Sequence, residues 1–176
     1  MPKNRFSRSF SVRDMAIAGL IAALYATLSY FANIFGVAFG PVQVRFSEAL
    51  CVLPFFFPAA VPGLFVGCFI ANLLSPYGAL DIVFGALATL LAAVWTQHTR
   101  HKWLAPLPPV ICNTLIIPAI ITWQAAQTAA PDDIMGALYL YNAFTIGLGE
   151  LAACYILGGL LLARLPKITP LKRYFS

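Results

Sequence analysis

The sequence predicts an all-α integral membrane protein built from six transmembrane helices. Three observations support this fold class: 61% of the 176 residues are hydrophobic, only 10% are charged, and the mean hydropathy is +0.84. Soluble domains carry about 25% charged and about 45–50% apolar residues. A soluble globule, a disordered chain and a nucleic-acid-binding basic domain are therefore excluded. At roughly 20 residues per crossing, the chain has no room for an additional soluble domain.

The expected helices follow from apolar runs bounded by proline, glycine and polar residues. Their approximate ranges are 14–35, 42–57, 59–74, 80–97, 107–124 and 137–165. The Ser-Pro-Tyr-Gly stretch at 75–78 is predicted to be a turn, and the segment 125–136 is predicted to be a polar loop. Because the second and third helices are short, a re-entrant pair is an alternative to two crossings. We expect one membrane domain over 1–176, with 14–165 as the bundle and tails at 1–13 and 166–176.

Basic residues predict the orientation of the chain. Ten of the 11 Lys and Arg residues lie in three short stretches, at 3–13, 100–102 and 164–173. Short loops rich in Lys and Arg stay on the cytoplasmic side of a membrane. Both termini and the loop at 98–105 are therefore expected to be cytoplasmic. Four crossings before this loop and two after it satisfy that requirement, and the re-entrant alternative satisfies it as well.

Of the other charges, Asp14 lies at the start of the first helix and Asp132 and Asp133 lie in the polar loop, whereas four lie in apolar surroundings. These four are Arg45, Glu48, Asp81 and Glu150, with a net charge of 1 − 3 = −2. A carboxylate inside a membrane is costly and usually functional. Because carboxylates accept hydrogen bonds in pairs, this set favours a ligand with adjacent N–H donors or an ammonium group over an anionic ligand. The predicted topology places most polar side chains in the outer halves of the helices, which indicates a small-molecule pocket open to the outside.

The candidate substrate-binding residues are the polar and aromatic side chains expected near that pocket. They are Arg45, Glu48, Asn72, Asp81, Asn113, Trp123, Tyr141 and Glu150.

Each candidate also has a purely structural interpretation. Arg45 and Glu48 are three residues apart and could neutralise one another on one helix face. The asparagines could form interhelical hydrogen bonds, and the aromatic residues could belong to an ordinary interfacial belt. Asp81 could be a residue at a helix N-terminus, where the helix dipole favours a negative charge. Glu150 could pair with Arg45.

Small residues repeat along one side of the first helix. Ala18, Ala22 and Ala26 are spaced by four, and Gly19 and Ala23 repeat this spacing one residue later. In lipid, such a pattern allows another helix to approach closely. Two interpretations follow, namely packing within this chain and docking on a separate membrane subunit.

The sequence does not predict an enzyme. It contains no phosphate-binding loop G-x-x-x-x-G-K-S/T, no H-E-x-x-H and no G-x-S-x-G. Its four cysteines are isolated in apolar stretches without a C-x-x-C pair, so we expect buried packing rather than a metal site or disulfide. We therefore expect no catalytic residue, metal or cofactor. Energy for transport must then come from a partner or an ion gradient.

Several ordered motifs resemble one known family. They are VQVRFSEAL at 42–50, PGLFVGC at 62–68 with ANLL at 71–74, DIVFG at 81–85, LAPLPPV at 104–110 and GLGE at 147–150. Together they resemble the QueT family, the queuosine-precursor S components (substrate-binding subunits) of energy-coupling factor (ECF) transporters. The resemblance covers nearly the whole chain.

The resemblance implies a six-helix bundle of the ECF S-component type. Such a protein would capture a 7-deazaguanine, in its aminomethyl or cyano form, or queuine, from outside. It would dock on a transmembrane T subunit through Ala18, Ala22 and Ala26, and two cytoplasmic ATPases would drive import. The motif positions implied as ligand contacts are Arg45, Glu48, Asn72, Asp81 and Glu150. The alternatives are an S component for another vitamin and a standalone small-molecule carrier.

Overall fold

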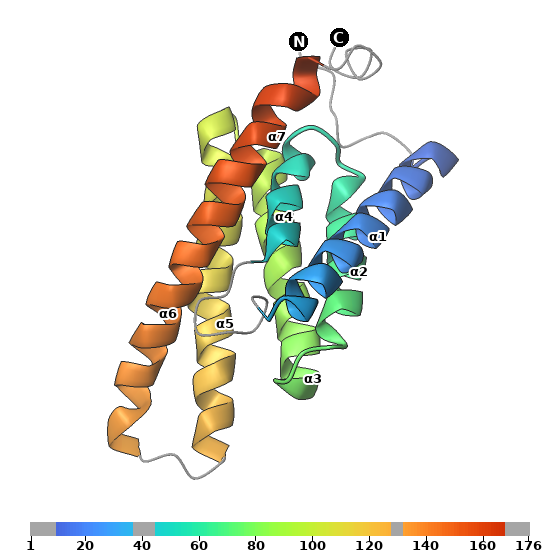
Figure 1. Ribbon diagram of the computed structural model, residues 1–176. Helices are drawn as coiled ribbons and strands as arrows, with labels where there is room; N and C mark the ends of the chain where they lie inside the picture. Colours follow the sequence, from blue (N-terminus) through green and yellow to red (C-terminus); the bar gives the residue numbers. More distant parts are fainter. Residues whose placement is uncertain (1–9, 37–44, 128–131, 168–176) are drawn as a thin grey trace.

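The computed structural model describes residues 10–36, 45–127 and 132–167, and all regular structure in these ranges is helical (Figure 1). In the labels, η marks 3₁₀ or π segments. The elements are α1 Val12–Ile34, η2 Phe46–Phe55, α2 Ala60–Asn72, α3 Gly78–Leu80, η3 Asp81–Gly85, α4 Ala86–His98, η4 Lys102–Leu104, α5 Leu107–Gln127, η5 Asp132–Ile134, α6 Met135–Leu151, η6 Ala152–Leu157, α7 Gly158–Arg164 and η7 Leu165–Lys167. The prediction of an all-α fold is confirmed.

The described residues form six helical segments in the predicted order, but the segments differ in length. Four are long and apolar enough to cross a membrane, namely Val12–Ile34, Gly78–His98, Lys102–Gln127 and Met135–Lys167. The other two, η2 and α2, have 10 and 13 residues. At about 1.5–2.0 Å per residue each reaches about 20 Å, less than the hydrocarbon core of about 30 Å. They are the pair for which the sequence left a re-entrant alternative open.

Several predicted boundaries move by a few residues. The helix expected to end at 124 continues to Gln127, so the first three residues of the predicted polar loop are helical. Residues 128–131 of that loop, residues 42–44 of the second predicted helix and most of both predicted tails lie outside the described residues. The predicted turn at 75–78 is confirmed, because Gly78 has a positive φ of 66° and the Tyr77 amide donates to Ser75 Oγ at 3.1 Å.

Helix α1 begins at a capping box and packs closely on α2. The Asp14 amide donates to Ser11 Oγ, and the Ser11 amide donates to the Asp14 carboxylate, which satisfies N–H groups left open at a helix start. A Cβ added at Gly63 would lie 2.6 Å from the Ala18 carbonyl oxygen. The two helices touch backbone to backbone because glycine leaves the space free.

The short helix η2 forms the centre of the bundle. Eight consecutive residues, Ser47–Pro54, are buried. Helix α7 lies against it so closely that a Cβ at Gly158 would come within 2.9 Å of Val52. Because η2 is enclosed by other helices, its polar side chains are held inside the protein rather than against lipid.

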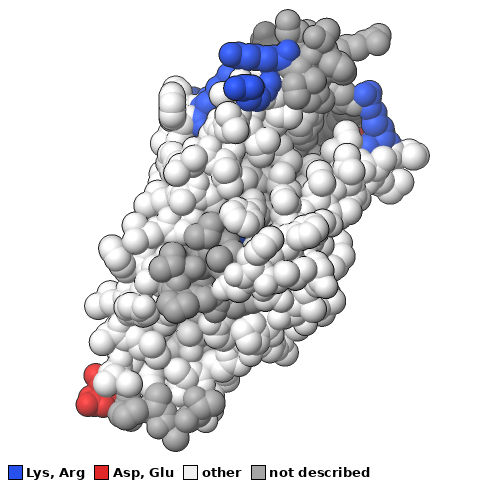
Figure 2. Space-filling model, in the orientation of Figure 1, with Lys and Arg blue, Asp and Glu red and all other residues white. Residues whose placement is uncertain are grey.

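Charged residues are separated along the molecule. Figure 1 shows the start of α1, the η4 turn and the end of α7 at one end of the bundle, and η5 at the other. Figure 2 shows Lys and Arg at the first end, acidic residues at the opposite end, and an almost uncharged surface between them. Many large hydrophobic side chains of the described residues, such as Leu140 and Phe144, are exposed. That distribution is typical of a protein surrounded by lipid.

Candidate functional site

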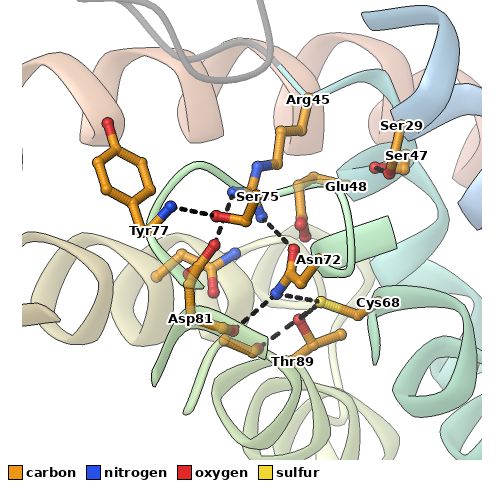
Figure 3. A network of polar contacts seen from close by, with 12 residues as sticks. Ser29, Arg45, Ser47, Glu48, Cys68, Asn72, Ser75, Tyr77, Asp81 and Thr89 are labelled. Atoms are coloured by element: carbon orange, nitrogen blue, oxygen red, sulfur yellow. Dashed lines mark hydrogen bonds and ion pairs between the residues drawn. The ribbon is translucent and has the colours of Figure 1, made fainter. Parts of the chain in front are cut away.

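Most of the predicted substrate-binding residues are buried together in the interior. Six of the eight are less than 10% exposed: Arg45, Glu48, Asn72, Asp81, Asn113 and Glu150. They come from η2 or its N-terminal flank, the end of α2, η3, α5 and α6. Figure 3 shows part of this network, in which side chains from segments distant in sequence point toward one another.

The first corner of the network joins Arg45, Asn72 and Asp81. Arg45 Nη2 lies 3.8 Å from Asp81 Oδ2, and Arg45 Nη1 donates to Asn72 Oδ1 at 3.4 Å. The amide nitrogen of Asn72 donates to the backbone carbonyl of Asp81 at 2.9 Å. Asn72 thus forms an interhelical hydrogen bond, as one interpretation of the sequence predicted. Asp81 lies in the first turns of the helix that starts at Gly78, with its carboxylate turned toward Arg45 (Figure 3).

Asn72 is held in place by a close approach of two helices. Its amide also lies 3.6 Å from Cys68 Sγ, which accepts from Thr89 Oγ1 at 3.2 Å. A Cβ at Gly85 would lie 2.5 Å from Asn72 Nδ2 and 3.1 Å from Asp81 Oδ1. Glycine at this position therefore leaves the space in which the amide and the carboxylate meet.

The second corner surrounds Glu48. Tyr25 Oη of α1 donates to Glu48 Oε1, and Cys51 Sγ donates to Glu48 Oε2 at 3.0 Å. Beside it, Ser29 Oγ of α1 donates to Ser47 Oγ at 2.7 Å. These contacts connect α1 to the centre of the bundle through polar groups that water cannot reach.

The third corner surrounds Glu150. Asn113 Nδ2 of α5 donates to Glu150 Oε1 at 2.9 Å, and Cys154 Sγ lies 3.6 Å from Glu150 Oε2. Cys154 also reaches the backbone carbonyl of Glu48 at 3.5 Å, so this corner is connected to the second one. Asn113 is therefore an interhelical donor, again as one interpretation of the sequence predicted.

Two of the acids lie at irregular helical turns. Asp81 opens the π segment η3, and the π segment η6 starts two residues after Glu150. A π turn inserts one residue into a helix, rotates the side chains that follow, and often marks a functional site. Both acids therefore lie at the N-terminal side of an irregular turn within an otherwise apolar span.

The two aromatic candidates differ from the other six because they lie on the surface. Trp123 and Tyr141 are each 55% exposed, so they are not brought into the buried network. Both positions suit the interfacial belt that the sequence offered as the alternative. Their part in ligand binding stays a prediction.

The small residues of α1 lie on two faces. Ala22 is buried against α2, where a Cβ at Gly67 would lie 2.9 Å from the Ala22 carbonyl oxygen. Ala18 and Ala26 are half-buried, whereas Gly19 and Ala23 are exposed. Packing within this chain therefore accounts for Ala22, and the exposed pair remains available to a partner.

Sequence reasoning missed Tyr25 and the polar role of the cysteines. Tyr25 lies three residues after Ala22, and Ser29 follows four residues later, so both share the buried face of α1. The signal that could have found Tyr25 is its position on the same helix face as Ala22, together with Ser29 one turn later. Three of the four cysteines, Cys51, Cys68 and Cys154, contact polar atoms of this network.

Within the described ranges, no group of three His, Cys, Asp or Glu side chains could hold a metal.

Spanning helices with a buried cluster of acids and amides define the class of this protein. Four apolar helices of spanning length make it a multi-pass membrane protein. The charged side chains that lie in apolar surroundings, Arg45, Glu48, Asp81 and Glu150, are buried in the interior rather than exposed to lipid.

The comparisons with known proteins specify the family. The chain belongs to the QueT transporter family, whose model matches residues 15–167. A relative from Lactococcus lactis subsp. cremoris (strain MG1363), named "Queuosine precursor transporter QueT", is 33% identical over 78 residues. That alignment covers 44% of this chain and only 46% of the relative. No solved structure matches the chain.

Proposed function

We propose that this protein is the substrate-binding S component of an ECF transporter, and that it captures a queuosine precursor of the 7-deazaguanine class from outside the cell. The observation that carries the proposal is the buried cluster of three carboxylates, two asparagines and one arginine inside a member of the QueT transporter family. The name of the Lactococcus relative supports the same substrate class.

The chemistry of the cluster suits a deazaguanine. The pyrimidine edge of such a ring carries adjacent N–H donors, which a carboxylate binds with both oxygens. An aminomethyl substituent adds a cation that a second carboxylate can bind. A net charge of 1 − 3 = −2 among Arg45, Glu48, Asp81 and Glu150 disfavours a phosphate or carboxylate ligand.

The energy for import comes from partner subunits in this proposal. The 176 residues contain no phosphate-binding loop, so ATP hydrolysis belongs to two separate ATPases. The T subunit docks on the exposed small residues of α1, where Gly19 and Ala23 allow close helix contact. The basic end of the bundle faces the cytoplasm, with six crossings in which η2 and α2 are the short pair.

Titration calorimetry on the purified protein in detergent tests the proposal. The cyano, aminomethyl and queuine forms are titrated separately, and at least one is expected to give a saturable heat of binding. Guanine and an unrelated vitamin serve as controls. If none of the three compounds gives a heat signal, while mass spectrometry of the purified protein detects another vitamin, the substrate assignment is wrong.

A further inference from the structure

The three buried acids differ in how their carboxylate oxygens are occupied. Both side-chain oxygens of Glu48, and both of Glu150, have a donor from a neighbouring side chain within 3.6 Å. Neither oxygen of Asp81 accepts a hydrogen bond from the described residues, although Asp81 is 0% exposed. A buried carboxylate with unused acceptors is unfavourable unless another molecule supplies donors. Asp81 is therefore the acid whose acceptors remain open to a ligand.

The charged neighbour of Asp81 is a guanidinium. Arg45 Nη2 approaches Asp81 Oδ2 at 3.8 Å, which is an ion pair but too long for a hydrogen bond. Arg45 is 9% exposed and Asp81 is fully covered, so Arg45 is the outer member of the pair. Figure 3 shows the guanidinium extending toward both Asp81 and Asn72.

A guanidinium and the pyrimidine edge of a 7-deazaguanine present the same pattern to a carboxylate. Arg offers paired N–H donors in one plane. The deazaguanine edge offers a ring N–H beside an exocyclic amine, which is also a planar N–C–N unit with two adjacent donors. Charge-assisted pairs of this kind normally close to about 2.7–2.9 Å. The longer Arg45 contact therefore leaves Asp81 available for a better-fitting donor pair.

We propose that Asp81 binds the two adjacent N–H donors of the substrate, and that the Arg45 guanidinium occupies this position until the substrate replaces it. The proposal rests on the proposed function, since it assigns one contact within that substrate site. Toward a ligand without a cation, such as the cyano form, Glu48 and Glu150 are then positioning residues, which hold α1, η2, α5 and α6 around the site. Asn72 has a similar task, because its amide fixes the backbone of Asp81 at 2.9 Å.

The test compares two ligands in several variants. The ligands are 7-cyano-7-deazaguanine and its analogue without the exocyclic amine, and calorimetry in detergent gives both dissociation constants. The wild-type chain is expected to bind the parent compound roughly 10- to 100-fold more tightly than the analogue, as for a good bidentate pair. In Asp81→Asn the two dissociation constants should differ by less than about threefold, because the amide offers a single acceptor oxygen.

Glu48→Gln and Glu150→Gln are the matched controls, since each also removes one buried carboxylate charge. They are expected to weaken both ligands by a similar factor and to keep the ratio between them. A ratio that survives in Asp81→Asn, or that disappears in either control, overturns the assignment. Absence of binding of both compounds to the wild-type chain would instead overturn the proposed function together with this inference.

Arg45→Lys tests the exchange separately. Lysine keeps the charge beside Asp81 but lacks the planar pair of donors. The parent compound is expected to bind this variant as tightly as the wild type or more tightly, because the competing group is a poorer match. Roughly tenfold weaker binding in a variant with wild-type thermal stability would overturn the exchange.

If Asp81→Asn is not recovered folded, Asp81→Glu moves the carboxylate by one methylene, and an unchanged ligand ratio in that variant counts against Asp81.

Discussion

Asn113 and Glu150 are bonded across the interface between α5 and α6, with 2.9 Å between the amide nitrogen and one carboxylate oxygen. The bond connects residues 37 positions apart, inside spans whose other side chains are mostly apolar. It gives a buried acid a donor that lipid could not provide.

Removal of this donor should destabilise the protein. Asn113→Ala leaves Glu150 Oε1 without its amide partner, and we expect the free energy of unfolding to fall by about 1–2 kcal/mol. Thermal unfolding in detergent measures the change. Asn142→Ala is the control, because its amide bonds to a carbonyl of its own helix at Leu138. Equal losses in both variants would mean that the interhelical bond contributes nothing specific.

The contact between α1 and α2 predicts a strict requirement for glycine. A Cβ at Gly67 would lie 2.8 Å from the Tyr25 Cβ and 2.9 Å from the Ala22 carbonyl oxygen. Gly67→Ala should therefore push the two helices apart and lower the unfolding free energy by about 1–3 kcal/mol. Gly159→Ala is the control, since no atom of the described residues lies within 4 Å of its added Cβ. The prediction fails if the unfolding temperatures of the two variants agree.

The two faces of α1 predict different outcomes for two adjacent substitutions. Ala23→Leu adds bulk to an exposed position, so the chain should fold normally but lose assembly with the proposed T subunit. Ala22→Leu adds bulk against α2 and should lower thermal stability of the isolated chain. Co-purification with the proposed partner subunits and thermal unfolding in detergent separate these effects. Normal assembly of Ala23→Leu would exclude this face as the docking surface.

Tyr25 and Glu48 should be energetically coupled. Tyr25→Phe removes the hydroxyl that donates to Glu48 and should cost about 1–3 kcal/mol, because a buried carboxylate oxygen loses a donor. In the double variant with Glu48→Gln the combined loss should be smaller than the sum of the single losses. A double-mutant cycle from unfolding measurements gives the coupling. Strict additivity would show that the two side chains do not stabilise one another.

The fold class and the position of the helices follow directly from the sequence. A chain with 61% hydrophobic residues must place its helices in lipid, and proline, glycine and polar stretches mark where those helices end. The sequence also indicated that charges within apolar runs are costly and therefore candidates for a functional site. These charges are Arg45, Glu48, Asp81 and Glu150. All four are buried in the structure.

The partners of those charges were decided only by tertiary structure. Arg45 pairs with Asp81, 36 residues away in sequence, although Glu48 is three residues away on the next turn. Ala22 faces α2 and Ala23 faces outward, a difference of one helical position that composition alone does not resolve. A sequence fixes which side chains must avoid lipid, because that cost depends on each residue itself. Which of them meet depends on how helices cross and where π turns rotate them, and these are properties of the assembled bundle.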